Sequence, residues 1–118
     1  QMCIRDRGQV VMVGSYAALR PAPSQAAYAA SKAALAGLVK SLAREWGKDG
    51  IRVNLVLPGF MLTEMTAVLR ESVKEAALSR HVLNRLNTPE QAAAFILFLQ
   101  DVLTAASGQV FDLDSRIV

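Results

Sequence analysis

Two short apolar segments, each closed by glycine or proline, constrain the fold more than any other feature of the sequence. The first is Gly8-Gln-Val-Val-Met-Val-Gly14, and the second is Ile51-Arg-Val-Asn-Leu-Val-Leu57, which is followed by Pro58-Gly59. Short, nearly continuous apolar runs are typical of strands buried on both faces, and such strands are usually parallel. Between them, residues 26–46 are rich in Ala, Leu and Lys, which favour a helix. The order strand, helix, strand predicts a parallel pair joined by a right-handed crossover.

The rest of the chain continues the alternation of helices and strands. Thr88 precedes Pro89, and Gln91 follows at the third position after Thr88, a pattern that predicts a helix start with a reciprocal capping box. We further expect a loop at 15–25, helices at 64–83 and 88–103, and a last strand at 109–113. The predicted fold class is α/β, with three parallel strands covered by helices.

The length of the chain limits how complete this fold can be. With 118 residues the chain suffices for one domain and is too short for two. Three parallel strands form a small sheet, and the first strand is apolar on both faces, so it would fit best at a sheet centre. A bare apolar edge invites association with other strands. We therefore expect the chain to be the second half of a larger protein.

Composition excludes several classes of protein. Hydrophobic residues make up 53% and charged residues 19%, which excludes a disordered chain. The net charge of +3 comes from scattered Lys and Arg, with no run that would form a nucleic-acid or membrane patch. The single cysteine, Cys3, excludes an internal disulfide framework and a cysteine zinc site, and we predict no metal ligands. The longest apolar stretches are too short to span a membrane and no signal peptide is visible, so we expect a cytoplasmic protein.

The first seven residues, Gln-Met-Cys-Ile-Arg-Asp-Arg, carry no helix or strand pattern that continues into the strand predicted from Gly8. They resemble the translation of sequencing-adapter read-through at the end of an assembled gene. The alternative is an exposed or disordered N-terminal leader. We assign no chemistry to residues 1–7 and expect the domain to span 8–118.

Tyr28 and Lys32 lie four residues apart on the predicted helix, and therefore on one face of it. An ammonium near a phenol lowers the phenol pKa from about 10, so such a tyrosine can exchange a proton with an alcohol or ketone near neutral pH. Ser15 follows the first strand, where open α/β sheets bind ligands, and its hydroxyl could hold a substrate oxygen for the tyrosine. The alternative is a solvated lysine beside a packed tyrosine, with Ser15 as a turn or cap residue.

Taken together, these segments resemble the C-terminal half of short-chain dehydrogenases/reductases, which share a Rossmann-type, doubly wound parallel sheet. The resemblance is continuous from Gly8 to about Leu113, and residues 58–66 are most similar to 3-oxoacyl-[acyl-carrier-protein] reductases. It rests on Gly14-Ser15, Tyr28-Ala-Ala-Ser-Lys32, Ile51-Arg-Val-Asn-Leu-Val-Leu-Pro-Gly59, Thr63 and Ala106-Ser-Gly-Gln-Val110.

The resemblance implies a role for each matching residue of the catalytic group. Tyr28 would be the general acid in carbonyl reduction and the base in the reverse direction. Lys32 would lower the pKa of Tyr28 and hydrogen-bond the nicotinamide ribose. Ser15 would orient and polarise the carbonyl of the substrate.

The resemblance also implies a nicotinamide cofactor, NADP or NAD. Pro58 and Gly59 would shape the loop along its nicotinamide half, and Thr63 would contact its carboxamide or pyrophosphate. Residues 61–86 would form a mobile lid over a small carbonyl or alcohol substrate, including acyl-carrier- or CoA-linked ones. His81 is most simply a solvated residue of that lid. The helix at 26–46 is apolar nearly all round, which predicts burial on more than one side and a homodimer or homotetramer of the longer parent.

Several features of the family have no counterpart in this sequence. It contains no glycine-rich turn for a pyrophosphate, no residue that would choose between NAD and NADP, and no Asn-Asn-Ala-Gly segment. Asp114-Ser115-Arg116 stand where the family commonly has Gly-Gly. We therefore predict a fragment, inactive alone, of an oxidoreductase that transfers a hydride. The alternatives are a non-catalytic nucleotide-binding-fold scaffold, a small interaction module, or a sugar-nucleotide epimerase or dehydratase.

Overall fold

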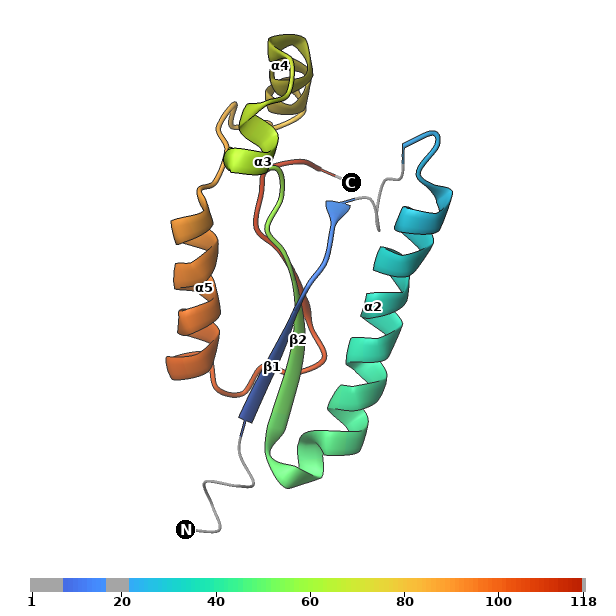
Figure 1. The fold of residues 1–118 in the computed structure, drawn as a ribbon. Helices are drawn as coiled ribbons and strands as arrows, with labels where there is room; N and C mark the ends of the chain where they lie inside the picture. The colour runs from blue at the N-terminus through green and yellow to red at the C-terminus, as the bar shows by residue number, and fades with distance from the viewer. Residues whose placement is uncertain (1–7, 17–21, 118) are drawn as a thin grey trace.

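The computed structural model describes residues 8–16 and 22–117. In this part of the chain it contains a three-stranded parallel sheet, made of β1 (Gly8–Val13), β2 (Ile51–Leu57) and β3 (Val110–Asp112) (Figure 1). The α/β class and the three parallel strands are confirmed. The expected leader at residues 1–7, with Cys3, lies outside the described residues.

The strands lie in the order in which they follow one another along the chain, β1-β2-β3. β2 is therefore the central strand, and it pairs with β1 from Gly8↔Ile51 to Val13↔Val56. β1 lies at the edge and not at the centre that its apolar sequence favours. Among the described residues no strand pairs with its outer side.

Helix α2 (Ala26–Trp46) covers one face of the sheet, as Figure 1 shows. The buried core on this face consists of Val39 from α2 and Val53, Leu55 and Leu57 from β2. Trp46 packs against this core at the end of the helix. A 3-10 turn, η2 (Gly47–Asp49), then ends at Gly50, whose positive φ of 74° closes the connection to β2.

In the part of the chain that the structure describes, one side of α2 is buried. Ala29 and Val39 are its buried residues, whereas Leu38 on another side is 45% exposed. Because the sheet covers one side only, burial of a second side in an oligomer of the longer parent stays a prediction.

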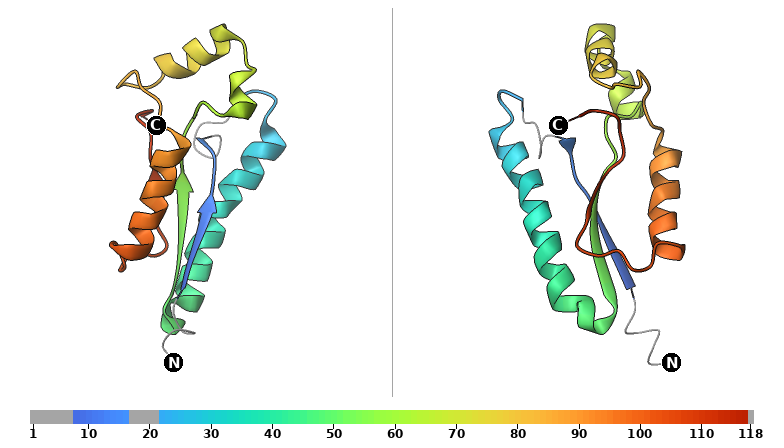
Figure 2. Two further views of the ribbon diagram at one scale, coloured as in Figure 1. Left: turned by 60° about the vertical axis from the view of Figure 1, so that its left-hand side comes forward. Right: turned by 180° about the vertical axis from the view of Figure 1, so that it is seen from behind.

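Helix α5 (Pro89–Asp101) covers the opposite face of the sheet, so the two views of Figure 2 show a sheet between two helices. Its start has the predicted capping box, with Thr88 and Gln91 bonded reciprocally. Leu99 of α5 is fully buried, and the Phe95 ring meets Phe111 of β3 edge-on at 5.2 Å. This two-layer covering is the doubly wound arrangement that the sequence predicts.

The continuous helix expected at 64–83 is instead two short helices, α3 (Glu64–Ala67) and α4 (Glu71–Ser79). Val68 closes α3, and Arg70 is extended, with φ −62° and ψ 147°. Both helices lie beyond the carboxyl ends of the strands (Figure 2).

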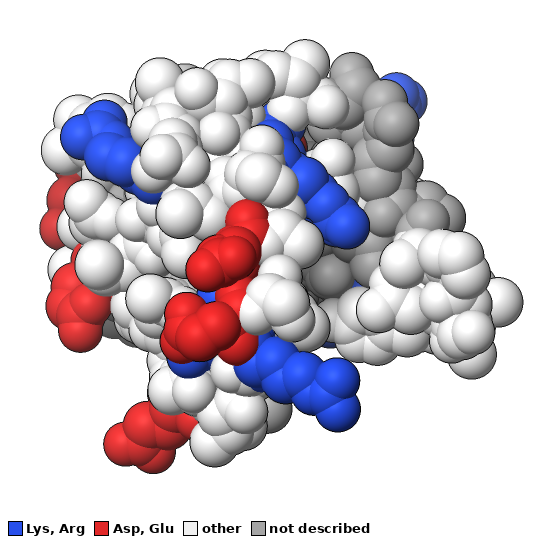
Figure 3. Space-filling model, turned by 90° about the horizontal axis from the view of Figure 1, so that it is seen from above, with Lys and Arg blue, Asp and Glu red and all other residues white. Residues whose placement is uncertain are grey.

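The surface above these strand ends is mostly uncharged, and Figure 3 shows acidic and basic side chains next to each other and not in one patch. Within the described residues no helix is long and apolar enough to cross a membrane.

Candidate active site

The carboxyl ends of the three strands meet at one edge of the sheet. Ser15 follows β1, Pro58 and Gly59 follow β2, and Asp114 follows β3. Backbone bonds continue the pairing to this edge, because Gly14 N donates to Val56 O at 2.9 Å and Leu113 N donates to Leu57 O at 3.0 Å. The structure therefore brings loops from three strands together where α/β sheets bind ligands.

Tyr28 and Lys32 come from the first turns of α2, at the same end of the molecule as these loops (Figure 1). The Lys32 Nζ atom lies 5.6 Å from the centroid of the Tyr28 ring, close enough for a cation–π contact. Tyr28 is 48% exposed, so a ligand can reach it. Within the described residues Lys32 has no ion-pair partner that would neutralise it. The predicted neighbourhood of phenol and ammonium is therefore present.

Ser15 is half-buried at the end of β1. It lies at the same end of the sheet as the first turns of α2. Residues 17–21, between Ser15 and α2 along the chain, lie outside the described residues. The structure thus places Ser15 and Tyr28 at one end of the fold, on separate elements.

Gly59 has a positive φ of 87°, a conformation that favours glycine. A Cβ atom at this position would lie 2.8 Å from both Cβ and Cγ of Asp114. The loop after β2 can therefore pass close to the segment after β3 only because residue 59 has no side chain.

Thr63 stabilises the start of α3. Its hydroxyl caps α3 by accepting from Thr66 N at 3.4 Å, and Thr66 Oγ1 in turn donates to Met61 O at 2.7 Å. This capping box positions the start of the segment expected to be the lid. Contact of Thr63 with a cofactor remains a prediction.

His81 is not the solvated residue that the sequence predicts, because it is only 3% exposed. Its Nδ1 lies 2.8 Å from Ala77 O and so carries a proton, and its Nε2 lies 3.3 Å from Asp114 Oδ2. The imidazole thus lies in the interior between a backbone carbonyl and a carboxylate. The prediction of a solvated residue is wrong because the ring packs beside Asp114, which comes from a distant segment of the chain.

Asp114 also binds Arg116, and the sequence pattern does not predict a functional role for this pair. Arg116 Nε donates to Asp114 Oδ2 at 2.6 Å, and the Arg116 backbone N–H donates to Oδ1 at 3.1 Å. Burial raises the pKa of Asp114, but the hydrogen bonds and charge of Arg116, together with the charge of His81, outweigh burial, and the pKa is lowered overall. Asp114 is therefore a carboxylate at neutral pH.

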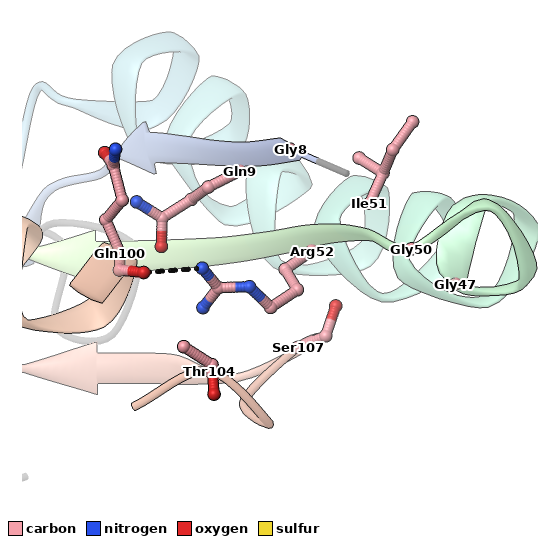
Figure 4. A pocket seen from close by; sticks show the side chains of 9 residues that line it. All are labelled: Gly8, Gln9, Gly47, Gly50, Ile51, Arg52, Gln100, Thr104 and Ser107. Atoms are coloured by element: carbon pink, nitrogen blue, oxygen red, sulfur yellow. Dashed lines mark hydrogen bonds between the residues drawn. The ribbon is translucent and has the colours of Figure 1, made fainter. Parts of the chain in front are cut away.

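A cavity of about 860 Å³ lies at the opposite end, by the amino ends of β1 and β2 (Figure 4). Gln9, Arg52, Gln100 and Ser107 are among its lining residues, and Arg52 points toward Gln100. None of the predicted site residues borders it. No group of His, Cys, Asp or Glu within 8–16 and 22–117 could hold a metal ion.

Comparison with known proteins relates this geometry to a family. A family model described as enoyl-(acyl carrier protein) reductase matches residues 1–115. The chain is 44% identical over 118 residues to a 3-oxoacyl-[acyl-carrier-protein] reductase of Thermotoga maritima, covering 99% of this chain and 48% of that protein. The chain belongs to the short-chain dehydrogenase/reductase family.

Other members of the short-chain dehydrogenase/reductase family match a similar region. A 3alpha-hydroxysteroid dehydrogenase of Mediterraneibacter gnavus is 39% identical over 108 residues, covering 91% of this chain and 43% of that protein. A solved 7 alpha-hydroxysteroid dehydrogenase in complex with NADH and 7-oxo glycochenodeoxycholic acid superposes with a TM-score of 0.88 and 30% identity. That match covers 97% of this chain and 46% of the solved chain. The chain therefore spans about half the length of the relatives it matches.

Proposed function

We propose that this chain supplies the catalytic half of an NAD(P)-dependent oxidoreductase that acts on a carbonyl or secondary alcohol. The observation that carries the proposal is the Tyr28–Lys32 pair at the carboxyl end of a parallel sheet, in a chain that belongs to an oxidoreductase family. Nothing in the packing of α2 requires this pair, because Tyr28 is exposed and Lys32 has no carboxylate partner among the described residues.

In carbonyl reduction, Tyr28 gives its phenolic proton to the carbonyl oxygen while the carbonyl carbon gains a hydride. The ammonium of Lys32 stabilises the phenolate that remains, and water then returns a proton to it. The Ser15 hydroxyl donates a hydrogen bond to the same carbonyl oxygen and holds it within reach of Tyr28. Oxidation of an alcohol runs through the same steps in reverse.

The residues at the strand ends suit the nicotinamide part of the cofactor. Hydroxyls and an ammonium are donors for ribose hydroxyls and a carboxamide, and Ser15, Tyr28, Lys32 and Thr63 provide them. Pro58 and Gly59 form the loop beside them. A bound NADPH or NADH supplies the hydride. The chain has no glycine-rich turn, so residues outside it must bind the pyrophosphate.

The relatives guide the proposals for substrate and assembly. Acyl-carrier-protein or CoA thioesters of 3-oxo acids are the first candidates, because 3-oxoacyl-[acyl-carrier-protein] reductases and an acetoacetyl-CoA reductase match this chain. We propose that the exposed side of α2, including Leu38, packs in a homodimer or homotetramer of a cytoplasmic protein.

The test uses a completed protein, in which the N-terminal half of the Thermotoga maritima reductase precedes residues 8–118. We expect it to oxidise NADPH or NADH in the presence of acetoacetyl-CoA. Tyr28→Phe should lower kcat about 10²–10⁴-fold, since it removes the proton donor. Lys32→Ala should also lower kcat, whereas Lys40→Ala, on the same helix but outside the site, should not.

A completed protein that folds and shows no activity would contradict the proposal. If Tyr28→Phe kept its activity, Tyr28 would not be the proton donor. The alternative of a non-catalytic nucleotide-binding scaffold would then be favoured.

A further inference from the structure

A group of polar and aromatic side chains around the buried carboxylate of Asp114 connects three loops at the carboxyl edge of the sheet. We name it the Asp114 cluster, and its members are Tyr16, His81, Asp114 and Arg116. The Asp114 side chain is 2% exposed and the Arg116 side chain 10% exposed. The cluster joins the loop after β1, the end of the lid segment and the segment after β3.

Asp114 fixes the position of the Arg116 guanidinium. Nε and Nη2 of Arg116 both approach Asp114 Oδ2, at 2.6 Å and 2.5 Å, and His81 Nε2 lies 3.3 Å from the same oxygen. Gly59 leaves the space that the carboxylate occupies. A buried carboxylate is costly unless paired, so this pairing strongly favours one position of the guanidinium.

The fixed guanidinium lies over the ring of Tyr16. Arg116 Cζ is 3.7 Å from the Tyr16 centroid, which is a stacking distance. Tyr16 is half-buried and directly follows Ser15. Restraining the ring of Tyr16 restrains the backbone turn that carries the Ser15 hydroxyl.

We propose that Arg116 is a positioning residue for Ser15, acting by its stack on Tyr16. This inference rests on the proposed function of Ser15 in holding the substrate carbonyl. Arg116 touches neither substrate nor cofactor in this proposal. Its effect is to keep the Ser15 hydroxyl within hydrogen-bond reach of the carbonyl oxygen, where a misplacement of about 1 Å can cost about a hundredfold in rate.

The test measures kcat and KM of the completed protein for acetoacetyl-CoA. Arg116→Ala should lower kcat about ten- to a hundredfold with little change in KM for the cofactor. Tyr16→Leu should act in the same way while leaving the Asp114–Arg116 pair intact, so a folding defect from an unpaired carboxylate does not obscure the result. Tyr16→Phe keeps the ring and should restore kcat. Arg44→Ala, on the far end of α2, is the matched control.

A double-mutant cycle separates positioning from general stability. If Arg116 acts through Ser15, Arg116→Ala should have almost no further effect on kcat in a Ser15→Ala background. A full further effect would overturn the inference, as would an unchanged kcat in both Arg116→Ala and Tyr16→Leu. In those cases activity that still depends on Tyr28 would leave the proposed function standing. An inactive completed protein would overturn both.

Discussion

Gly59 is the residue whose backbone leaves the least choice of amino acid. Its φ of 87° disfavours any side chain, and a Cβ would overlap with buried Asp114. We predict that Gly59→Ala lowers the free energy of unfolding of the completed protein by about 1–3 kcal/mol. Urea unfolding measures this change.

Gly37 provides the matched control for that substitution. It lies in α2 with nothing within 4 Å of a Cβ built on it. Gly37→Ala should raise stability by up to about 1 kcal/mol, because alanine favours the helix. Equal changes in unfolding free energy for Gly59→Ala and Gly37→Ala would contradict the explanation by the positive φ of Gly59 and its overlap with Asp114.

Asp114 predicts how stability depends on pH. Its pKa is lowered in the folded chain, so its contribution is fully present above its unfolded pKa of about 3.9 and is lost as pH falls through the lower folded value. We predict that Asp114→Asn is less stable than the unsubstituted protein at pH 7, and that the difference shrinks below about pH 4. Urea unfolding across pH checks this.

Asp112 titrates in the opposite sense and must be separated from Asp114. Burial, followed by the charge of Asp114, raises the pKa of Asp112, so protonation of Asp112 favours the folded state. Repeating the pH series in Asp112→Asn removes that contribution. With Asp112→Asn present, the difference in unfolding free energy between the proteins with and without Asp114→Asn should still change with pH. A difference that is the same at every pH would refute the assignment to Asp114.

The surroundings of a residue could be predicted from sequence where its contacts are local, and could not where its contacts come from distant segments of the chain. Tyr28 and Lys32 lie on one helix face, so their spacing alone predicts that they are neighbours. His81 contacts Asp114, which lies far along the chain after β3. No local sequence pattern predicts that contact. The sequence therefore predicted the contact between Tyr28 and Lys32 correctly and the exposure of His81 wrongly.

At the scale of elements, Arg52 connects the central strand with α5. Its Nη1 donates to Leu99 O at 2.6 Å and to Leu103 O at 3.1 Å, and its Nη2 donates to Gln100 O at 3.3 Å. The guanidinium thus satisfies carbonyls at the end of a helix that has no basic residue in its own last turn.

We predict that Arg52→Ala lowers the free energy of unfolding by about 1.5–3 kcal/mol, the range for hydrogen bonds to a charged group. Thermal unfolding of the completed protein measures the loss. Arg44→Ala, in the last turn of α2, should change stability by less than about 0.5 kcal/mol. A loss in Arg52→Ala no larger than that of the control would show that the three bonds contribute little.

Element boundaries were predictable where the sequence contains a cap or a breaker. Thr88 and Gln91 form the expected capping box, and Gly50 ends the connection after α2. The break between α3 and α4 was missed, because residues 68–70 (Val-Leu-Arg) include neither glycine nor proline.

At the scale of the whole molecule, the outer side of β1 leads us to expect that the cofactor site is incomplete in this chain. No described strand pairs with it, and the sequence has no turn for a pyrophosphate. We predict no saturable binding of NADPH or NADH to the 118-residue chain by calorimetry, and saturable binding to the completed protein. Binding of equal strength to both would show that the described half holds the whole cofactor site.

Helix α2 is long enough for a small tilt to displace the side chains of its first turns. Its 21 residues carry Tyr28 near one end, and the other end is held by Trp46 against the core. At about 1.5 Å per residue, these two side chains are about 27 Å apart along the axis, so a tilt of about 2° at the Trp46 end would move Tyr28 by about 1 Å. Rate is sensitive to displacements of that size. In the proposed reaction, side chains that fix the tilt of α2 against the core would therefore affect the rate, and distance from the substrate would be a poor guide to which substitutions slow it.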